Sequence, residues 1–396
     1  MHRRAFIQSA VASTLLCSLP AFAKATPLIL SAPLTHSDWM LHPGTPWGPE
    51  GVRRMLDECK ACGLSRIYWR TFDGGRALYH SKYLKPMGPW DEDNCWNPKS
   101  AESKAFFKSF MGVTEEQRLD IFHKMQKLDY STFDPLAEAV RYGHEIGLQI
   151  HGWLSINEDD HGWGLQSEFS KAHPQFYWHK KDGTPYRSQL SFAFPEVRKY
   201  KLALIEELTS HYQLDGLFLD WIRTGDIRDN PQNLPDGEAN YGFEKGKDLT
   251  IAQRAEPQTV FMRQVHKLAR KKHLPLAVMV GHPWHYRGKM DRIDGNLRGL
   301  LLDVKTWAKE GLFDSSVAAG YYRDGGTAEK AWHALQEETS GKNTWLFGWV
   351  PKSIPDFQSN VTLAKTLGAK EILFWEADYI EGMANDLRQE MQQASI

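Results

Sequence analysis

Short apolar runs rich in β-branched and aromatic residues alternate along the chain with longer segments of helical periodicity, starting near residue 27. This alternation is typical of repeated β–α units that build a parallel sheet. Gly, Pro and Asp flank the apolar runs, as turns require. The pattern predicts eight strands, at Leu28–Pro33, Ser65–Thr71, Leu148–Leu154, Gly216–Trp221, Leu276–Gly281, Ser315–Tyr321, Thr344–Val350 and Glu371–Glu376.

Helical segments follow these strands. Gly48–Gly63 opens with a proline and closes on a glycine, and Asp134–Gly147 opens with an N-capping aspartate. The remaining predicted helices are Pro195–Tyr212, Pro257–His273, Asn296–Gly311, Thr327–Thr339, Asp356–Gly368 and Met383–Gln393. Eight strands, each followed by a helix, predict a single α/β domain over residues 24–396, a (β/α)8 TIM barrel. An open doubly wound sheet is the alternative, but no Gly-rich phosphate turn follows any strand.

Three connections are much longer than the others. They are residues 74–133 after strand two, 157–190 after strand three and 223–255 after strand four. The first contains a further helical stretch, Ala101–Lys127. All three follow the carboxyl ends of strands, which form the face of a barrel that carries active sites. We therefore expect the functional site at this face.

The first 23 residues have the features of an export signal. Arg3 and Arg4 make the start positive, an apolar run extends to Leu19, and Ala21-Phe22-Ala23 is a cleavage pattern. The paired arginines predict the bacterial twin-arginine route, with a plain secretory signal as the alternative. We expect a periplasmic or secreted mature protein without a membrane span.

Composition and charge limit the partners. The chain is 24% charged with a formal net charge of −1, so neither nucleic acid nor an anionic membrane surface is indicated. Cys59 and Cys62 have the C-x-x-C spacing of redox and zinc sites, but they fall inside a predicted helix and no second pair follows. We expect them to be buried helix cysteines and, with Cys95, to form no disulfide scaffold. The oligomeric state stays open.

An acidic residue ends the fourth predicted strand. Alternation along this strand directs Phe218 and Asp220 toward the barrel interior, and Leu217 and Leu219 toward the helices. A carboxyl group at the end of an apolar strand is costly to bury without a partner or a purpose. Capping a loop or pairing with Arg223 is the structural alternative to a catalytic role.

The eighth strand ends in a second acidic cluster. Glu376 and Asp378 share one face there, with Trp375 on the opposite face. Strands four and eight lie across a barrel from each other, and cleavage of a glycosidic bond takes two carboxyl groups. We predict Asp220 as nucleophile or general base and Glu376, with Asp378 as its substitute, as general acid. Both retaining and inverting mechanisms, and endo and exo cleavage, stay open.

Aromatic residues near the strand ends favour a saccharide site. The chain has 15 tryptophans, about three times an ordinary share, and aromatic rings stack on the apolar faces of sugars. We expect about half of those near strands to line a cleft and the rest to be core. The predicted substrate contacts are Arg70, Asp73, His151, Trp153, Trp221, His282, Tyr322, Trp349 and Trp375. A core position is as consistent for His151 as a ligand contact, and a solvated loop explains the acids Glu158, Asp159 and Asp160.

Three segments resemble the bacterial family-10-like glycosyl-hydrolase-like barrel proteins. They are Phe133–Leu136 leading through Gly147 to His151–Leu154, then Asp215–Asp220, and then Asp303–Trp307 leading to Gly311–Asp314 and Tyr321-Tyr322. The resemblance implies glycosidase activity, with Asp220 at the position of the family's strand-four acid. The fourth strand ends in Asp rather than the Asn-Glu of family-10 xylanases, and the seventh has no Glu. Xylan specificity is therefore not implied.

Competing chemistries lack their motifs. His36-Ser37-Asp38 stands where zinc amidohydrolase barrels have H-x-H, and neither H-E-x-x-H nor G-x-S-x-G occurs. We expect neither a metal nor another cofactor, and a carbohydrate as the partner. Two alternatives remain, a non-catalytic carbohydrate-binding barrel and a metal-assisted hydrolase or lyase that uses His151 and His282.

Overall fold

A computed structural model describes residues 28–35, 48–87, 93–106, 114–160, 164–180, 182–223, 243–281, 295–319, 327–375, 377, 380 and 382–394. The predicted signal segment, residues 1–23, lies outside these ranges. Within them, no helix is long and apolar enough to cross a membrane.

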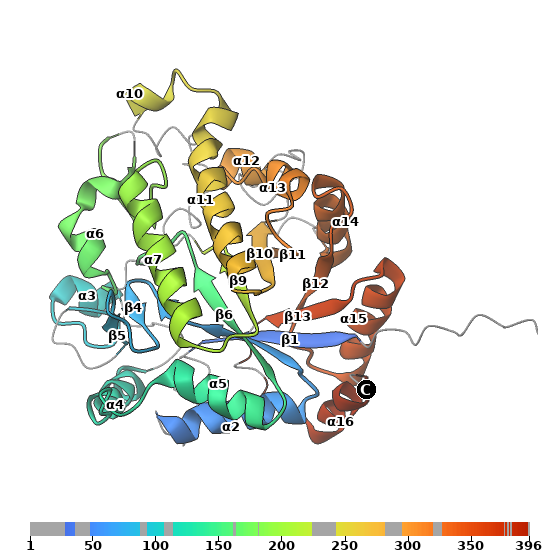
Figure 1. The fold of residues 1–396 in the computed structure, drawn as a ribbon. Helices are drawn as coiled ribbons and strands as arrows, with labels where there is room; N and C mark the ends of the chain where they lie inside the picture. Colours follow the sequence, from blue (N-terminus) through green and yellow to red (C-terminus); the bar gives the residue numbers. More distant parts are fainter. Residues whose placement is uncertain are drawn as a thin grey trace, which may run out of the picture.

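Eight parallel strands form a closed barrel, which confirms the predicted fold class. Their order around the barrel is β1-β13-β12-β11-β10-β9-β6-β2, so β9 and β13, the fourth and eighth barrel strands, lie opposite each other as expected. Figure 1 shows the strands at the centre of the molecule with helices around them. The strands are β1 (Ile29–Leu34), β2 (Arg66–Arg70), β6 (Gln149–Ser155), β9 (Gly216–Asp220), β10 (Leu276–Gly281), β11 (Ser315–Ala319), β12 (Thr344–Trp349) and β13 (Glu371–Trp375).

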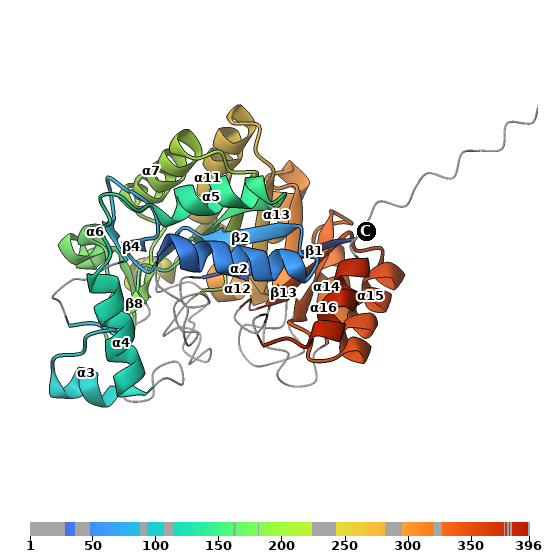
Figure 2. The same ribbon diagram turned by 90° about the horizontal axis from the view of Figure 1, so that it is seen from below.

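A ring of helices covers the barrel. In Figures 1 and 2, α2 lies beside α5, and α7 lies beside α11, in agreement with their contacts. The helices of the ring are α2 (Pro49–Ala61), α5 (Pro135–Glu145), α7 (Pro195–His211), α11 (Ile251–Lys271), α12 (Gly295–Leu300), α13 (Val304–Glu310), α14 (Ala328–Glu338), α15 (Ile354–Leu367) and α16 (Asn385–Ala394).

Smaller elements fill the long connections. After β2 come β3 (Phe72–Asp73), β4 (Arg76–Ala77) and β5 (Lys85–Pro86), then α3 (Ala101–Phe106) and α4 (Glu115–Gln126), and Figure 2 shows α3 and α4 set apart from the ring. After β6 come α6 (Glu168–Ala172), the 3-10 turn η2 (Pro174–Phe176) and the hairpin β7 (Tyr177–His179) and β8 (Pro185–Leu190). After β9 the structure describes α10 (Phe243–Gly246).

Local capping explains where most helices start. Asp134 caps α5 by accepting from the Ala137 amide, with Pro135 at the first turn as predicted. The helix predicted from Pro257 instead begins at Ile251, because Thr250 and Gln253 form a capping box that carries the helix through the proline. Apolar periodicity predicted this helix, but Pro257 placed its predicted start six residues too late.

Two other predicted helices are each divided. The segment Asn296–Gly311 forms α12 and α13, separated at Leu301, which has a φ of +61°. Asp303 then caps α13. The stretch Ala101–Lys127 forms α3 and α4, and a capping box at Thr114 starts the second helix. A change of direction in the backbone leaves little trace in hydrophobic periodicity.

The core has two layers. Alternate strand residues point outward and form one large cluster with the helices, which includes Leu217, Leu219 and the buried Cys59 and Cys62. The other alternate residues fill the barrel interior, namely Tyr68, Trp153, Phe218, Ala277, Met279, Val317, Ala319, Trp345, Phe347, Leu373 and Trp375. Cys59, Cys62 and Cys95 are buried and are not joined by disulfides, and burial raises the pKa of Cys62 to about 11. The expectation of buried cysteines outside any disulfide scaffold is confirmed.

Candidate functional site

Asp220 ends β9 inside the carboxyl-end face of the barrel. Its side chain is fully buried. Oδ2 accepts a hydrogen bond from Trp153 Nε1 at 3.1 Å, and Oδ1 accepts one from the Ile222 amide at 3.0 Å. Burial raises the pKa of Asp220 to about 6, and the negative charge of Glu158 adds to the rise, while the positive charge of Arg223 opposes it. Asp220 therefore caps its own turn and also carries the perturbed pKa that is typical of functional carboxyl groups.

Two arginines lie over the indole that donates to Asp220. The guanidinium carbons of Arg70 and Arg223 are 5.3 Å and 5.4 Å from the ring centroid of Trp153. Arg70 ends β2 and pairs in register with Trp153 on β6, which places both side chains in one layer of the barrel. This layer lies directly beneath Asp220 and Ser155, which are themselves paired in register. Arg70 and Trp153 thus lie beside Asp220, and both are buried.

Arg70 also holds two carboxylates. Its Nη2 forms an ion pair with Asp73 Oδ1 at 2.7 Å and a second with Glu158 Oε1, and its Nε donates to the Phe72 carbonyl at 3.2 Å. Asp73 and Glu158 are almost fully buried. Arg223 Nε is 3.8 Å from the same Glu158 oxygen. The loops after β2, β6 and β9 therefore meet in one buried cluster of charges.

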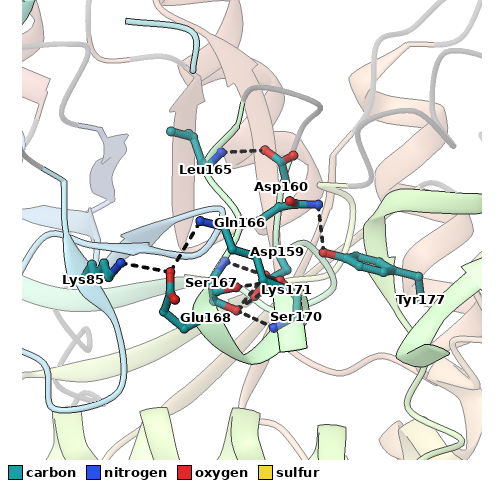
Figure 3. A network of polar contacts seen from close by, with 10 residues as sticks. All are labelled: Lys85, Asp159, Asp160, Leu165, Gln166, Ser167, Glu168, Ser170, Lys171 and Tyr177. Carbon is teal, nitrogen blue, oxygen red and sulfur yellow. Dashed lines mark hydrogen bonds and ion pairs between the residues drawn. The ribbon is translucent and has the colours of Figure 1, made fainter. Parts of the chain in front are cut away.

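The acidic segment after β6 is not a solvated loop. Glu158, Asp159 and Asp160 are at most 2% exposed. Asp159 Oδ2 accepts from the Ser167 amide, at 3.0 Å, and from both hydroxyl groups of Ser167 and Ser170, while Asp160 accepts from the Leu165 amide at 3.0 Å (Figure 3). Asp159 and Asp160 thus accept hydrogen bonds from the loop that leads into α6, whereas Glu158 pairs with Arg70.

A buried lysine supports this segment from below. Lys201 on α7 is 1% exposed, and its Nζ donates to the Glu158 carbonyl at 2.9 Å and lies 4.0 Å from Asp159 Oδ1. Burial lowers the pKa of Lys201 and raises the pKa of Asp159, while each charge favours the other. Lys201 thereby fixes the backbone at Glu158.

Aromatic side chains divide between the two core layers. Trp375 lies inside the barrel with its ring centroid 5.3 Å from that of Trp153, and it also contacts Phe347. Trp349, two residues after Phe347 on β12, is 43% exposed and packs edge-on against it. Ring contacts thus run without a break from the buried Trp153 through Trp375 and Phe347 to the exposed indole of Trp349.

Trp221 does not share this surface. It packs in the outer core against Phe192, Phe261 and Trp307 and is fully buried. Alternation already directed it away from Asp220, and the structure makes it a packing residue rather than a substrate contact. Trp69 is likewise part of the outer core.

His151 lies deeper in the barrel than the other candidates. It pairs in register with Tyr68 and Gly216 near the amino ends of their strands. The ring is 4% exposed, and neither nitrogen has a hydrogen-bond partner within the described part of the chain. Burial lowers the pKa of His151 to about 3. It is a core histidine rather than a residue at the carboxyl-end face.

Four predicted site residues, Glu376, Asp378, His282 and Tyr322, lie outside the described residues. On β13, Glu371 accepts from Ser31 and Tyr68 inside the barrel, and Leu373 and Trp375 are also interior residues. Over the ranges that can be searched, no three His, Cys, Asp or Glu residues are grouped as metal ligands.

Three charged residues were not predicted from the sequence to belong to the site, namely the buried Glu158 and Lys201 and the half-buried Arg223. A signal existed for Lys201, because it lies on the helix face shared by Val197, Leu204, Ile205 and Leu208. Glu158 follows β6 at the carboxyl-end face, which is itself a functional signal. Its burial depends on contacts with β2 and α7 that periodicity does not reveal.

Two solved structures illustrate the fold of this chain. The glycoside hydrolase domain of PgaB (BpsB) from Bordetella bronchiseptica matches with a TM-score of 0.54 and 11% identity, covering 93% of this chain and 99% of that chain. The catalytic domain of a β-amylase from Paenibacillus polymyxa matches with a TM-score of 0.55 and 10% identity, covering 94% and 98%. At these identities the likeness concerns the fold alone.

Sequence comparison is more specific. The glycosyl hydrolase YngK of Bacillus subtilis is 22% identical over 229 residues, which are 54% of this chain and 37% of that protein. The chain thus corresponds to little more than a third of this relative. The profile of the family described as Glycosyl hydrolase-like 10 matches residues 98–345, which include β6, β9 and Asp220. The chain therefore belongs to the glycosyl hydrolase-like 10 family, as the resemblance predicted.

Proposed function

We propose that this protein is an exported glycoside hydrolase that cleaves the glycosidic bonds of a poly- or oligosaccharide. The observation that carries the proposal is Asp220, a buried carboxyl group with a pKa raised to about 6 at the carboxyl-end face of a barrel of this family. A carboxyl group with a pKa near the working pH can both give and take a proton. The exposed indole of Trp349 supports a sugar as the ligand.

The raised pKa assigns Asp220 a role in proton transfer. A nucleophilic carboxylate must be ionised, whereas a general acid needs a raised pKa. We therefore assign Asp220 as the acid that protonates the leaving oxygen, in place of the nucleophile or general base expected from the sequence. Glu376 and Asp378 remain the proposed partners that attack or activate water.

Reducing-sugar release from a panel of polysaccharides tests this proposal, with mature protein of residues 24–396 beside Asp220→Asn, Glu376→Gln and Asp378→Asn. We expect release by the wild type and a loss of at least about a hundredfold in Asp220→Asn, the usual contribution of general acid catalysis. A loss below tenfold would remove Asp220 from the mechanism. A parallel reaction with a chelator tests the metal-assisted alternative. A metal-assisted enzyme would lose activity, whereas a carboxylate-based glycosidase would keep it.

A second candidate is a non-catalytic carbohydrate-binding barrel. The complete burial of Asp220 favours it, because a catalytic carboxyl group must reach its substrate. The same panel decides between the two: binding to a glycan without release, unchanged in Asp220→Asn, would establish the binding protein.

Export is proposed from the Arg3-Arg4 pair and the Ala21-Phe22-Ala23 cleavage pattern. Mass spectrometry of the amino terminus of protein from the periplasmic fraction tests it. A start at Lys24 supports the proposal, and an intact Met1 in the cytoplasmic fraction contradicts it.

A further inference from the structure

Glu158 is a buried carboxylate that the proposed reaction does not yet use. It is fully buried, pairs with Arg70 through Oε1 and lies 3.8 Å from Arg223 Nε through the same atom. Both arginines lie over the ring of Trp153, whose Nε1 donates to Asp220. Arg70, Arg223 and Trp153 thus lie between Glu158 and Asp220.

The loop around Glu158 is built to hold it in place. Lys201 donates to its backbone carbonyl at 2.9 Å, and Glu158 forms an isolated β-bridge with Gln189 of β8. The next residue, Asp159, is bound by the amide and hydroxyl groups of the loop into α6 (Figure 3). Such a support on both sides is what keeps a charge at a fixed distance from a reacting group.

We propose that Glu158 is a positioning residue that controls the protonation of Asp220 through the Arg70–Trp153–Arg223 cluster. The effect of Glu158 on catalysis rests on the proposed function, but its effect on the pKa of Asp220 does not. Glu158 faces both arginines beside Trp153, and its removal takes one negative charge from the cluster while Arg70 keeps its ion pair with Asp73. Asp220 would then be ionised at the pH where it has to donate a proton.

Among the described residues, two charged side chains act most strongly on the pKa of Asp220. Arg223 follows it in the same loop, and Glu158 reaches it from the loop after β6. Its register neighbours, Ser155 on β6 and Met279 on β10, are uncharged. Within the described structure, the balance between Glu158 and the arginines therefore determines the local potential.

Carboxyl 13C NMR of protein labelled at aspartate tests the proposal without any enzyme assay. Asp220→Asn identifies the resonance of Asp220 by its disappearance, and the titration of that resonance is followed in wild type and in Glu158→Gln. We expect the pKa of Asp220 to fall by about one unit or more in Glu158→Gln, the size of effect that a neighbouring charge typically has. If the wild type releases sugar, the apparent pKa of Asp220 in the pH profile of kcat/KM should fall by the same amount in Glu158→Gln.

Glu207→Gln is the matched control. Glu207 on α7 is also a buried glutamate, 4% exposed, but it accepts hydrogen bonds from Tyr79, Ser81 and the Lys82 amide and is not among the main charges that shift the pKa of Asp220. It should leave the titration of Asp220 unchanged. If Glu158→Gln does not fold, Glu158→Asp keeps the charge but withdraws it by one methylene, and a smaller fall is expected.

An unchanged titration in the folded Glu158 variant overturns the proposal. This outcome is distinct from failure of the proposed function, in which the titration shifts as expected but no glycan is cleaved. An equal shift in Glu207→Gln would also overturn it, because the effect would then be a general response to the loss of a buried carboxylate.

Discussion

Acid should destabilise this barrel through His151. The imidazole lies 4% exposed in the barrel interior, and the ring of Tyr68 meets it edge-on at a centroid distance of 5.4 Å. Neither ring nitrogen has a hydrogen-bond partner in the described ranges. Burial, followed by the positive charge of Arg66, lowers the pKa of His151 to about 3. The folded protein therefore holds this histidine neutral.

The magnitude follows from proton linkage. An unfolded histidine has a pKa of about 6.5, so between about pH 6.5 and pH 3 the unfolded chain binds a proton that the folded chain does not. Stability is thus lost as the pH falls through this window. Between pH 7 and pH 5 the loss amounts to about 2 kcal/mol, which is a large part of the stability of an ordinary domain.

Urea unfolding at pH 7 and pH 5 measures this loss in wild type and in His151→Leu, which has a side chain of similar size that does not titrate. The variant should lose about 2 kcal/mol less than the wild type over this range. Other groups, such as the buried Asp220 and Glu371, titrate in both proteins and cancel in the comparison. His333→Leu, a change at an exposed histidine of α14, should behave as wild type. Equal losses in wild type and His151→Leu, within about 0.5 kcal/mol, would refute the reasoning.

Three further predictions follow from the same structure. The folded pKa of Asp220, about 6, lies above the unfolded value of about 3.9, so the contribution of Asp220 to stability should fall by about 2.4 kcal/mol as the pH rises from 4 to 8, and the change in unfolding free energy over this range should differ by that amount between wild type and Asp220→Asn. Trp349→Ala should raise KM or the dissociation constant for the cleaved or bound glycan about tenfold, from lost stacking, without a change in Tm. Trp221→Ala should lower the free energy of unfolding by about 3–5 kcal/mol and leave the KM of the folded enzyme unchanged. Trp349→Ala should instead change KM and leave stability unchanged.

The fold was largely predictable from hydrophobic periodicity. All eight barrel strands were placed within about two residues of their observed bounds, because a strand buried under helices reads as a short apolar run. Helix ends were harder where capping and periodicity disagreed. Pro257 suggested a start that the capping box at Thr250 moved by six residues, and the turn at Leu301 divided a helix that periodicity left whole.

The candidate site was predictable in its location but not in its internal connections. Alternation directed Asp220 inward, and the structure buries it at the end of β9. The predicted substrate contact at Trp221 is wrong, because its indole packs in the outer core, whereas Trp375 lies inside the barrel. The neighbours of a side chain in a closed barrel come from other strands, and the face on which a strand begins is decided by its pairing partners.

The sequence alone determined a single α/β barrel, the face that carries its site, and the acid that ends its fourth strand. Only the tertiary structure decided which charges meet that acid. Arg70 and Glu158 are 88 residues apart in the chain, and Trp153 and Asp220 are 67 apart. Local pattern reports on residues within a few positions of one another, whereas burial and pairing of charge depend on long-range contacts that exist only once the barrel is closed.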